Sequence, residues 1–156
     1  MSPASSVTAI RAASNAIWNT PPVELRQIAA VHRPPSRDMA KRIYLNSDVY
    51  WIPQFFFIVA QRMRAKEQGW TEITRLLSDM VPTFGTRLKL WGFTQAADVL
   101  NTGGKGLSTA ATLEDALAVI DELVLYLQRL QGWVDATIPW AALDAIAPLP
   151  LRKPSP

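Results

Sequence analysis

The spacing of apolar residues between positions 113 and 131 constrains the fold more than any other feature. Apolar residues recur there at alternating intervals of four and three, at Leu113, Leu117, Ile120, Val124 and Leu127. This spacing places them on one face of an α-helix, and Thr112 with Asp115 resembles the capping box that starts one. Similar spacing recurs along the chain, whereas the period-two alternation of a half-buried strand is almost absent. The sequence therefore predicts an all-α fold, a single-domain helical bundle of about six to eight helices, some of them short.

Length and composition agree with one folded domain. The chain has 156 residues, of which 49% are hydrophobic and 19% charged, and domains commonly contain about 100–150 residues. We expect residues 1–147 to form the helical domain and the proline-rich residues 148–156 to form an extended tail. The most apolar segment, residues 49–60, is shorter than the ~20 residues of a membrane span, and the N-terminus lacks a signal-peptide pattern. We therefore predict a cytoplasmic protein without a membrane span.

Prolines and glycines set the expected helix boundaries. Helices are predicted at about 7–18, 21–32, 36–46, 49–68, 71–82 and 113–131. The helix at 49–68 is apolar nearly all round, so we expect it at the centre of the bundle. Two short helices are expected within residues 83–101, divided at Gly92. Residues 101–106 (Asn-Thr-Gly-Gly-Lys-Gly) are predicted to form a flexible loop, and a last short helix carries Trp140.

The residue types exclude several kinds of site. The chain has no cysteine and one histidine, His32, which excludes disulfides, cysteine nucleophiles and metal sites that need several histidines from one chain. The segment around Lys105 lacks the first glycine of a Walker A motif. We therefore expect no metal and no cofactor, and we favour a non-enzymatic function.

Charge is distributed unevenly along the chain. The net charge of +3 consists of +5 over residues 1–75 and −2 over residues 76–156. Such asymmetry produces surfaces of opposite potential that attract different partners. If the helices at 36–46 and 49–68 pair as a hairpin, their cations merge into one patch able to bind nucleic-acid phosphates; an ordinary solvated surface is the alternative. The candidate nucleic-acid-binding residues are Arg33, Arg37, Lys41, Arg42, Arg62, Arg64, Lys66 and Lys105.

The six tryptophans are many for a chain of this length. Most should lie in the core, but tryptophan is also enriched where proteins bind one another. Trp70, Trp91 and Trp133 each adjoin a glycine at a predicted helix boundary. We therefore expect these three near the surface, with one or two of them exposed as partner-binding residues.

Two functional interpretations remain open. The first is a non-catalytic helical subunit or adaptor of a larger assembly, which binds a protein partner or a second copy of itself and has nucleic acid as a further candidate partner. The second is a small helical enzyme or ligand-binding protein with an aromatic-lined pocket. The residues of that alternative pocket are Asp48, Tyr50, Trp51 and His32, with Asp48 or His32 as the titrating group.

Overall fold

The fold is known from a computed structural model, which describes residues 1–21, 41–65, 69–138 and 141, except for the side chains of residues 41–48. The described residues form five α-helices, a 3-10 turn and no strand. The elements are α1 (Pro3–Asn15), η1 (Ile17–Asn19), α3 (Lys41–Ala65), α4 (Trp70–Leu90), α5 (Thr94–Ser108) and α6 (Leu113–Thr137). The all-α prediction is confirmed, and the five helices in these ranges are slightly fewer than the six to eight expected.

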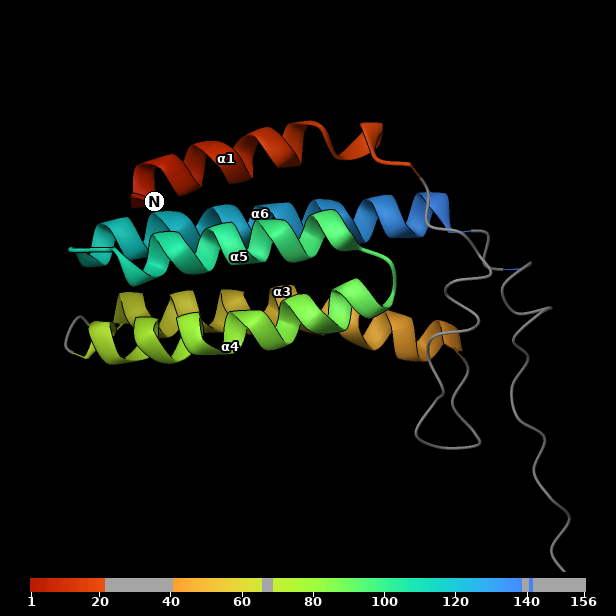
Figure 1. Ribbon diagram of the computed structural model, residues 1–156. Helices are drawn as coiled ribbons and strands as arrows, with labels where there is room; N and C mark the ends of the chain where they lie inside the picture. Colours follow the sequence, from red (N-terminus) through yellow and green to blue (C-terminus); the bar gives the residue numbers. More distant parts are fainter. Residues whose placement is uncertain (22–40, 66–68, 139–140, 142–156) are drawn as a thin grey trace, which may run out of the picture.

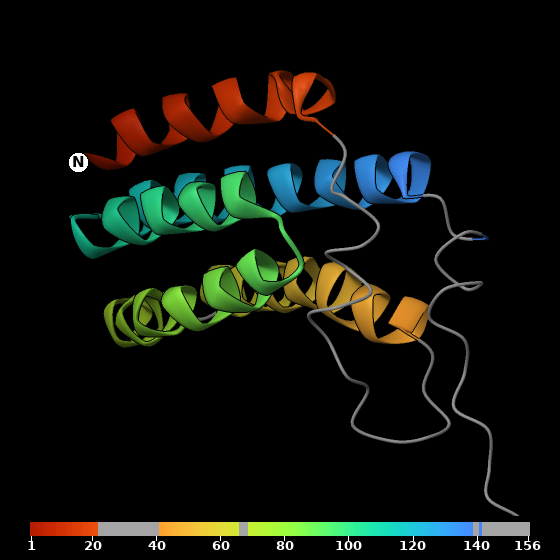
Figure 2. The same ribbon diagram turned by 45° about the vertical axis from the view of Figure 1, so that its right-hand side comes forward.

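The helices are arranged in three layers (Figure 1). Helices α3, α4, α5 and α6 form an antiparallel four-helix bundle, in which each packs against the next and α6 packs back against α3. Helix α1 lies over α5 and α6, on the side opposite α3 and α4 (Figure 2). The middle layer of α5 and α6 is therefore covered from both sides, while α3 and α4 form an outer layer.

Helix α6 begins where the sequence predicts and ends later. The Thr112 hydroxyl accepts a hydrogen bond from the backbone N–H of Asp115 at 3.1 Å, which confirms the predicted cap. The helix continues through Gly132 to Thr137 rather than ending near residue 131. Its last turns stay helical because Trp133 and Val134 are buried in the core.

Two prolines lie inside helices, and one of them, Pro82, is predicted to end its helix. Helix α4 continues through Pro82, and α3 runs through Pro53 as one helix instead of the two predicted there. A proline inside a helix costs about 3 kcal/mol or more. Around Pro82, however, Leu77, Val81 and Phe84 are all buried, and burial of one such side chain contributes about 1.5–3 kcal/mol. Core packing on both sides of the proline therefore outweighs its local cost.

The glycine-rich segment predicted to be a loop is part of helix α5, so that prediction is wrong. Its glycines let neighbouring helices approach closely. A Cβ atom added to Gly103 would lie 2.6 Å from a methyl of Leu123 on α6, and one added to Gly106 would lie 2.4 Å from the Ser6 hydroxyl on α1. The tight helix packing that this approach allows offsets the low helix propensity of glycine, which no local rule anticipates.

The predicted break at Gly92 is confirmed. Helix α4 ends at Leu90, α5 begins at Thr94, and Gly92 has a φ of 95°, in the left-handed region that favours glycine. The N–H of Gly92 donates to the carbonyl of Lys89 at 2.9 Å, and that of Phe93 donates to Leu88 at 3.0 Å. This pair of bonds is the glycine-dependent helix ending known as the Schellman motif.

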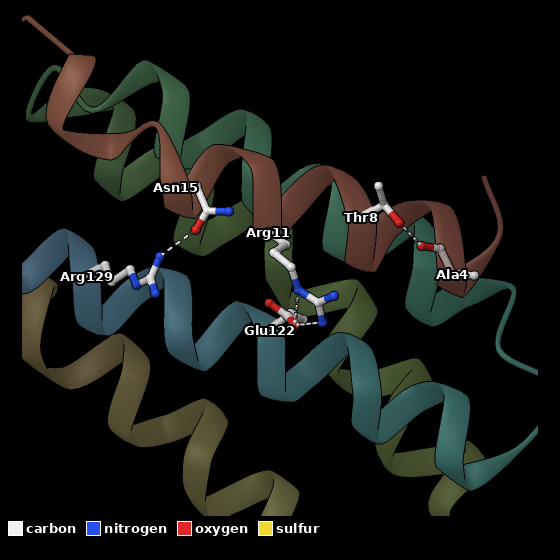
Figure 3. Close-up of polar contacts among 6 residues, drawn as sticks. All are labelled: Ala4, Thr8, Arg11, Asn15, Glu122 and Arg129. Carbon is white, nitrogen blue, oxygen red and sulfur yellow. Dashed lines mark hydrogen bonds and ion pairs between the residues drawn. The ribbon is translucent and has the colours of Figure 1, made fainter.

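Polar contacts hold α1 in register with α6 (Figure 3). Arg11 Nε donates to Glu122 Oε1 at 3.0 Å, and the same guanidinium forms an ion pair with that oxygen. One turn further along α1 and two turns further along α6, Arg129 donates to the side-chain oxygen of Asn15 at 3.0 Å. The Glu122 side chain is only 12% exposed, so Arg11 neutralises a carboxylate that is largely removed from water.

Candidate interaction surfaces

The cationic residues of α3 do not form the single patch predicted from the sequence. Lys41 and Arg42 lie in the first turn of this 25-residue helix, and Arg62 and Arg64 lie in its last turn. A rise of 1.5 Å per residue separates the two groups by roughly 30 Å. The hairpin expected to merge them does not exist, because its two helices are one. Of the other candidates, Lys105 is exposed on α5, and Arg33, Arg37 and Lys66 lie outside the described residues. Nucleic-acid binding by these side chains stays a prediction.

Two polar contacts join α3 to α6 along one side of the bundle. The Tyr50 hydroxyl donates to the Asp135 carboxylate, and Arg64 forms an ion pair with Asp121. On both helices the two contacts are two heptads apart, as expected for facing stripes of antiparallel helices. The hydrogen bond to Asp135, with smaller effects of burial and the Asp135 charge, raises the pKa of Tyr50 to about 12. Tyr50 is thus held as a neutral hydrogen-bond donor between the helices.

The alternative aromatic pocket is not assembled by the residues that the structure describes. Tyr50 faces α6, whereas Trp51 stacks on Phe55 with ring centroids 5.4 Å apart and meets the edge of Phe84 on α4 at 5.6 Å. Neighbouring residues on a helix point about 100° apart, so Tyr50 and Trp51 lie on different sides of α3. His32 and the side chain of Asp48 lie outside the described parts.

Two of the three tryptophans expected near the surface lie in the core. Trp91 is 0% and Trp133 is 2% exposed, while Trp70 is half-buried. Trp133 packs edge-on against Phe93, with ring centroids 6.1 Å apart. The expectation of surface exposure is therefore wrong for Trp91 and Trp133, because the helix ends on which they lie pack inward. A partner-binding role for Trp70 stays a prediction.

An exposed apolar surface, which is not predicted from the sequence, instead runs along the outer layer. We call it the α3–α4 seam, and it consists of Trp51, Phe55 and Ile58 on α3 with Leu76 and Met80 on α4. These five side chains are half-buried or exposed, with Trp51, Ile58 and Leu76 each at least 50% exposed. Phe84 contacts the rings of both Trp51 and Phe55, which joins the two helices across the seam.

The position of α3 explains why this surface is exposed. The sequence predicts the apolar helix at 49–68 in the centre of the bundle, but α3 lies in an outer layer (Figure 1). Ile52 and Phe56 fill the core from one face of α3, and the seam residues Trp51, Phe55 and Ile58 form a second apolar face at spacings of four and three. The sequence signal for this exposed surface is the apolar character all round the helix, which here reflects two contact faces rather than a central position.

Two hollows adjoin each other on another side of α4, along α5. One, of about 330 Å³, extends from Trp70 to Asp79, and the other, of about 360 Å³, extends from Ser78 to Lys105. They share the lining residues Ser78 and Ser108, and we call the two adjoining hollows together the α4–α5 groove. Ser78 is about 200° around α4 from both Leu76 and Met80, so the groove and the seam face different directions.

In the part of the chain that the structure describes, no group of three or more His, Asp or Glu side chains is placed to hold a metal ion. None of the described helices combines the length and the apolar character needed to cross a membrane. In comparisons with known proteins, no family model, curated protein or solved structure matches this chain.

Proposed function

We propose that the protein is a non-catalytic helical subunit that assembles with a second copy of itself through the α3–α4 seam. The observation that carries this proposal is the exposure of five apolar side chains on two helices that pack against each other. Single exposed apolar residues are ordinary, whereas contiguous apolar patches mark interaction sites. An exposed tryptophan such as Trp51 within such a patch is typical of residues that dominate binding energy.

The size of the outer layer suits a dimer interface. Helix α4 has 21 residues and is therefore about 30 Å long, and two packed helices are roughly 20 Å wide. This face offers roughly 600 Å² per copy, close to the ~800 Å² per partner of a standard-size interface.

The charges of α4 favour an antiparallel arrangement of the two copies. Glu72 lies in the first turn of α4, and Arg87 and Lys89 lie in its last turn. A two-fold axis near Met80, midway along the helix, brings the acidic end of α4 in one copy to the basic end of α4 in the other. The charges of α4 are thus complementary to themselves in this arrangement, as an isologous interface requires, and the last turn of α3 adds Arg62 and Arg64 at the Glu72 end.

Analytical ultracentrifugation of the full chain over a range of concentrations tests the proposal. We expect a monomer–dimer equilibrium for the wild type and a monomer for the variant Ile58→Glu/Leu76→Glu, because each dimer would bury four unpaired carboxylates. The matched control is Leu125→Glu on α6, a residue that is 39% exposed and outside the seam. Helical content of all three proteins, measured by circular dichroism, shows that the variants are folded.

The oligomeric states of the wild type, the seam variant and the control decide the proposal. A dimer that dissociates in the seam variant and persists in the control supports the proposal. A wild type that remains monomeric at several hundred micromolar contradicts it, and so does a dimer that survives both seam substitutions.

A further inference from the structure

The α4–α5 groove is a feature distinct from the proposed dimer seam. Small residues line part of it. Ser78 Oγ donates to the carbonyl of Gly104 at 3.2 Å, and Gly104 has no side chain. A Cβ atom at Gly104 would lie 3.3 Å from Val81. Close packing of α4 against α5 at this point therefore leaves a depression between their outer surfaces rather than filling it.

Two cationic side chains from opposite walls line this groove. Arg75 comes from α4 and lines the first hollow, and Lys105 comes from α5 and lines the second. Both side chains flank the shared residues Ser78 and Ser108. The structure shows no ion pair or hydrogen bond from either side chain to a described residue, in contrast to Arg11 on α1. Two cations that line adjoining hollows, one from each helix, favour a ligand with a multiply charged anionic group.

Other groups in the groove limit what such a ligand can be. Asp79 lines the first hollow beside Arg75, so the net charge of the three side chains is +1 and an acceptor is available for ligand hydroxyl groups. The half-buried ring of Trp70 lines the same hollow. Beneath them, Thr74 is 3% exposed and its hydroxyl has no hydrogen-bond partner. A buried hydroxyl without a partner is unfavourable, and it needs an explanation where it lines a hollow.

From these contacts we propose that the α4–α5 groove binds a small phosphomonoester that carries hydroxyl groups. Its phosphate lies between the forked guanidinium of Arg75 and the compact ammonium of Lys105, which come from opposite walls. Its hydroxyl groups donate to Asp79, and its less polar part contacts the Trp70 ring.

Nuclear magnetic resonance of the ¹⁵N-labelled full chain tests the proposal with three probes: ribose 5-phosphate, ribose and inorganic phosphate. We expect ribose 5-phosphate to produce saturable shifts in the amides of residues 70–82 and 101–110. The double variant Arg75→Ala/Lys105→Ala should weaken this binding by about a hundredfold, because each lost charged contact is worth about tenfold. The control Arg62→Ala/Lys89→Ala removes equal charge from described, exposed positions outside the groove and should leave binding within about threefold.

Each outcome decides the proposal. Saturable shifts that are lost in the groove variant, kept in the control and absent with ribose support a phosphomonoester site. Inorganic phosphate that shifts the same amides more weakly agrees with the proposed position of the phosphate. The site is refuted if ribose 5-phosphate gives no saturable shift at millimolar concentration, if ribose binds equally well, or if both double variants lose binding alike. The same experiments with a seam variant separate this site from dimer formation, because the two surfaces lie on different sides of α4.

Discussion

Replacing Gly106 by alanine tests whether the close approach of α1 to α5 holds the glycine-rich segment in its helix. Helix propensity alone favours alanine over glycine by about 1 kcal/mol. The new Cβ atom, however, would lie 2.4 Å from Oγ and 2.6 Å from Cβ of Ser6, whereas favourable carbon contacts are about 3.5–4.0 Å. Because the Cβ of Ser6 is fixed to the backbone of α1, the clash cannot be relieved by a side-chain rotation, and α1 has to move.

The size of the effect follows from three contributions. Overpacking costs about 1–3 kcal/mol. Displacing Ser6 also lengthens the 3.0 Å hydrogen bond from its hydroxyl to the carbonyl of Thr102, which contributes about 1 kcal/mol. The gain in helix propensity offsets roughly the second of these costs. We therefore expect Gly106→Ala to lower the free energy of unfolding by about 1–3 kcal/mol.

Gly132→Ala is the matched control, because Gly132 lies within α6 and no neighbouring atom is within 4 Å of an added Cβ. This variant should raise the free energy of unfolding by up to about 1 kcal/mol. Urea unfolding followed by circular dichroism measures both variants against the wild type. If Gly106→Ala stabilises the protein as Gly132→Ala does, the close packing of α1 on α5 does not exist and the explanation of the helix is wrong.

Three further predictions concern polar groups. Arg11→Ala should destabilise the protein by about 1–3 kcal/mol, since it leaves a mostly buried carboxylate unpaired. Arg64→Ala removes an exposed ion pair and should cost at most about 1 kcal/mol. Equal losses of the free energy of unfolding in urea would contradict this ranking. Thr74→Val replaces a buried hydroxyl that has no partner and should raise the free energy of unfolding of the ligand-free protein by about 1 kcal/mol, so a destabilised variant would show that the hydroxyl is satisfied. Because the pKa of Tyr50 is raised from 10.0 to about 12, its contribution to stability is present below pH 10 and disappears as the pH rises through about 12. Tyrosinate absorbance should show this titration moving toward pH 10 in Asp135→Asn, and an unchanged titration curve would exclude Asp135 as the cause.

Local sequence signals were sufficient wherever the structure depends on neighbours in the chain. The Thr112 cap, the apolar face of α6 and the break at Gly92 each depend on residues within one or two helical turns, and each prediction is confirmed. The candidate site residues were less predictable. Exposure of Trp91 or Trp51 depends on which helix lies above each ring, and the spacing of residues along one helix does not contain that information.

The sequence by itself determined that the described chain is helical, because apolar spacing of three and four residues can bury a continuous face only in an α-helix. Tertiary structure alone decided three other features: α4 continues through Pro82, the glycine-rich segment is helical, and the described helices leave the second apolar face of α3 uncovered. Each of these reverses a local preference worth a few kcal/mol at most. Packing between helices supplies energies of that size from residues distant in the chain, so only the assembled bundle can decide the outcome.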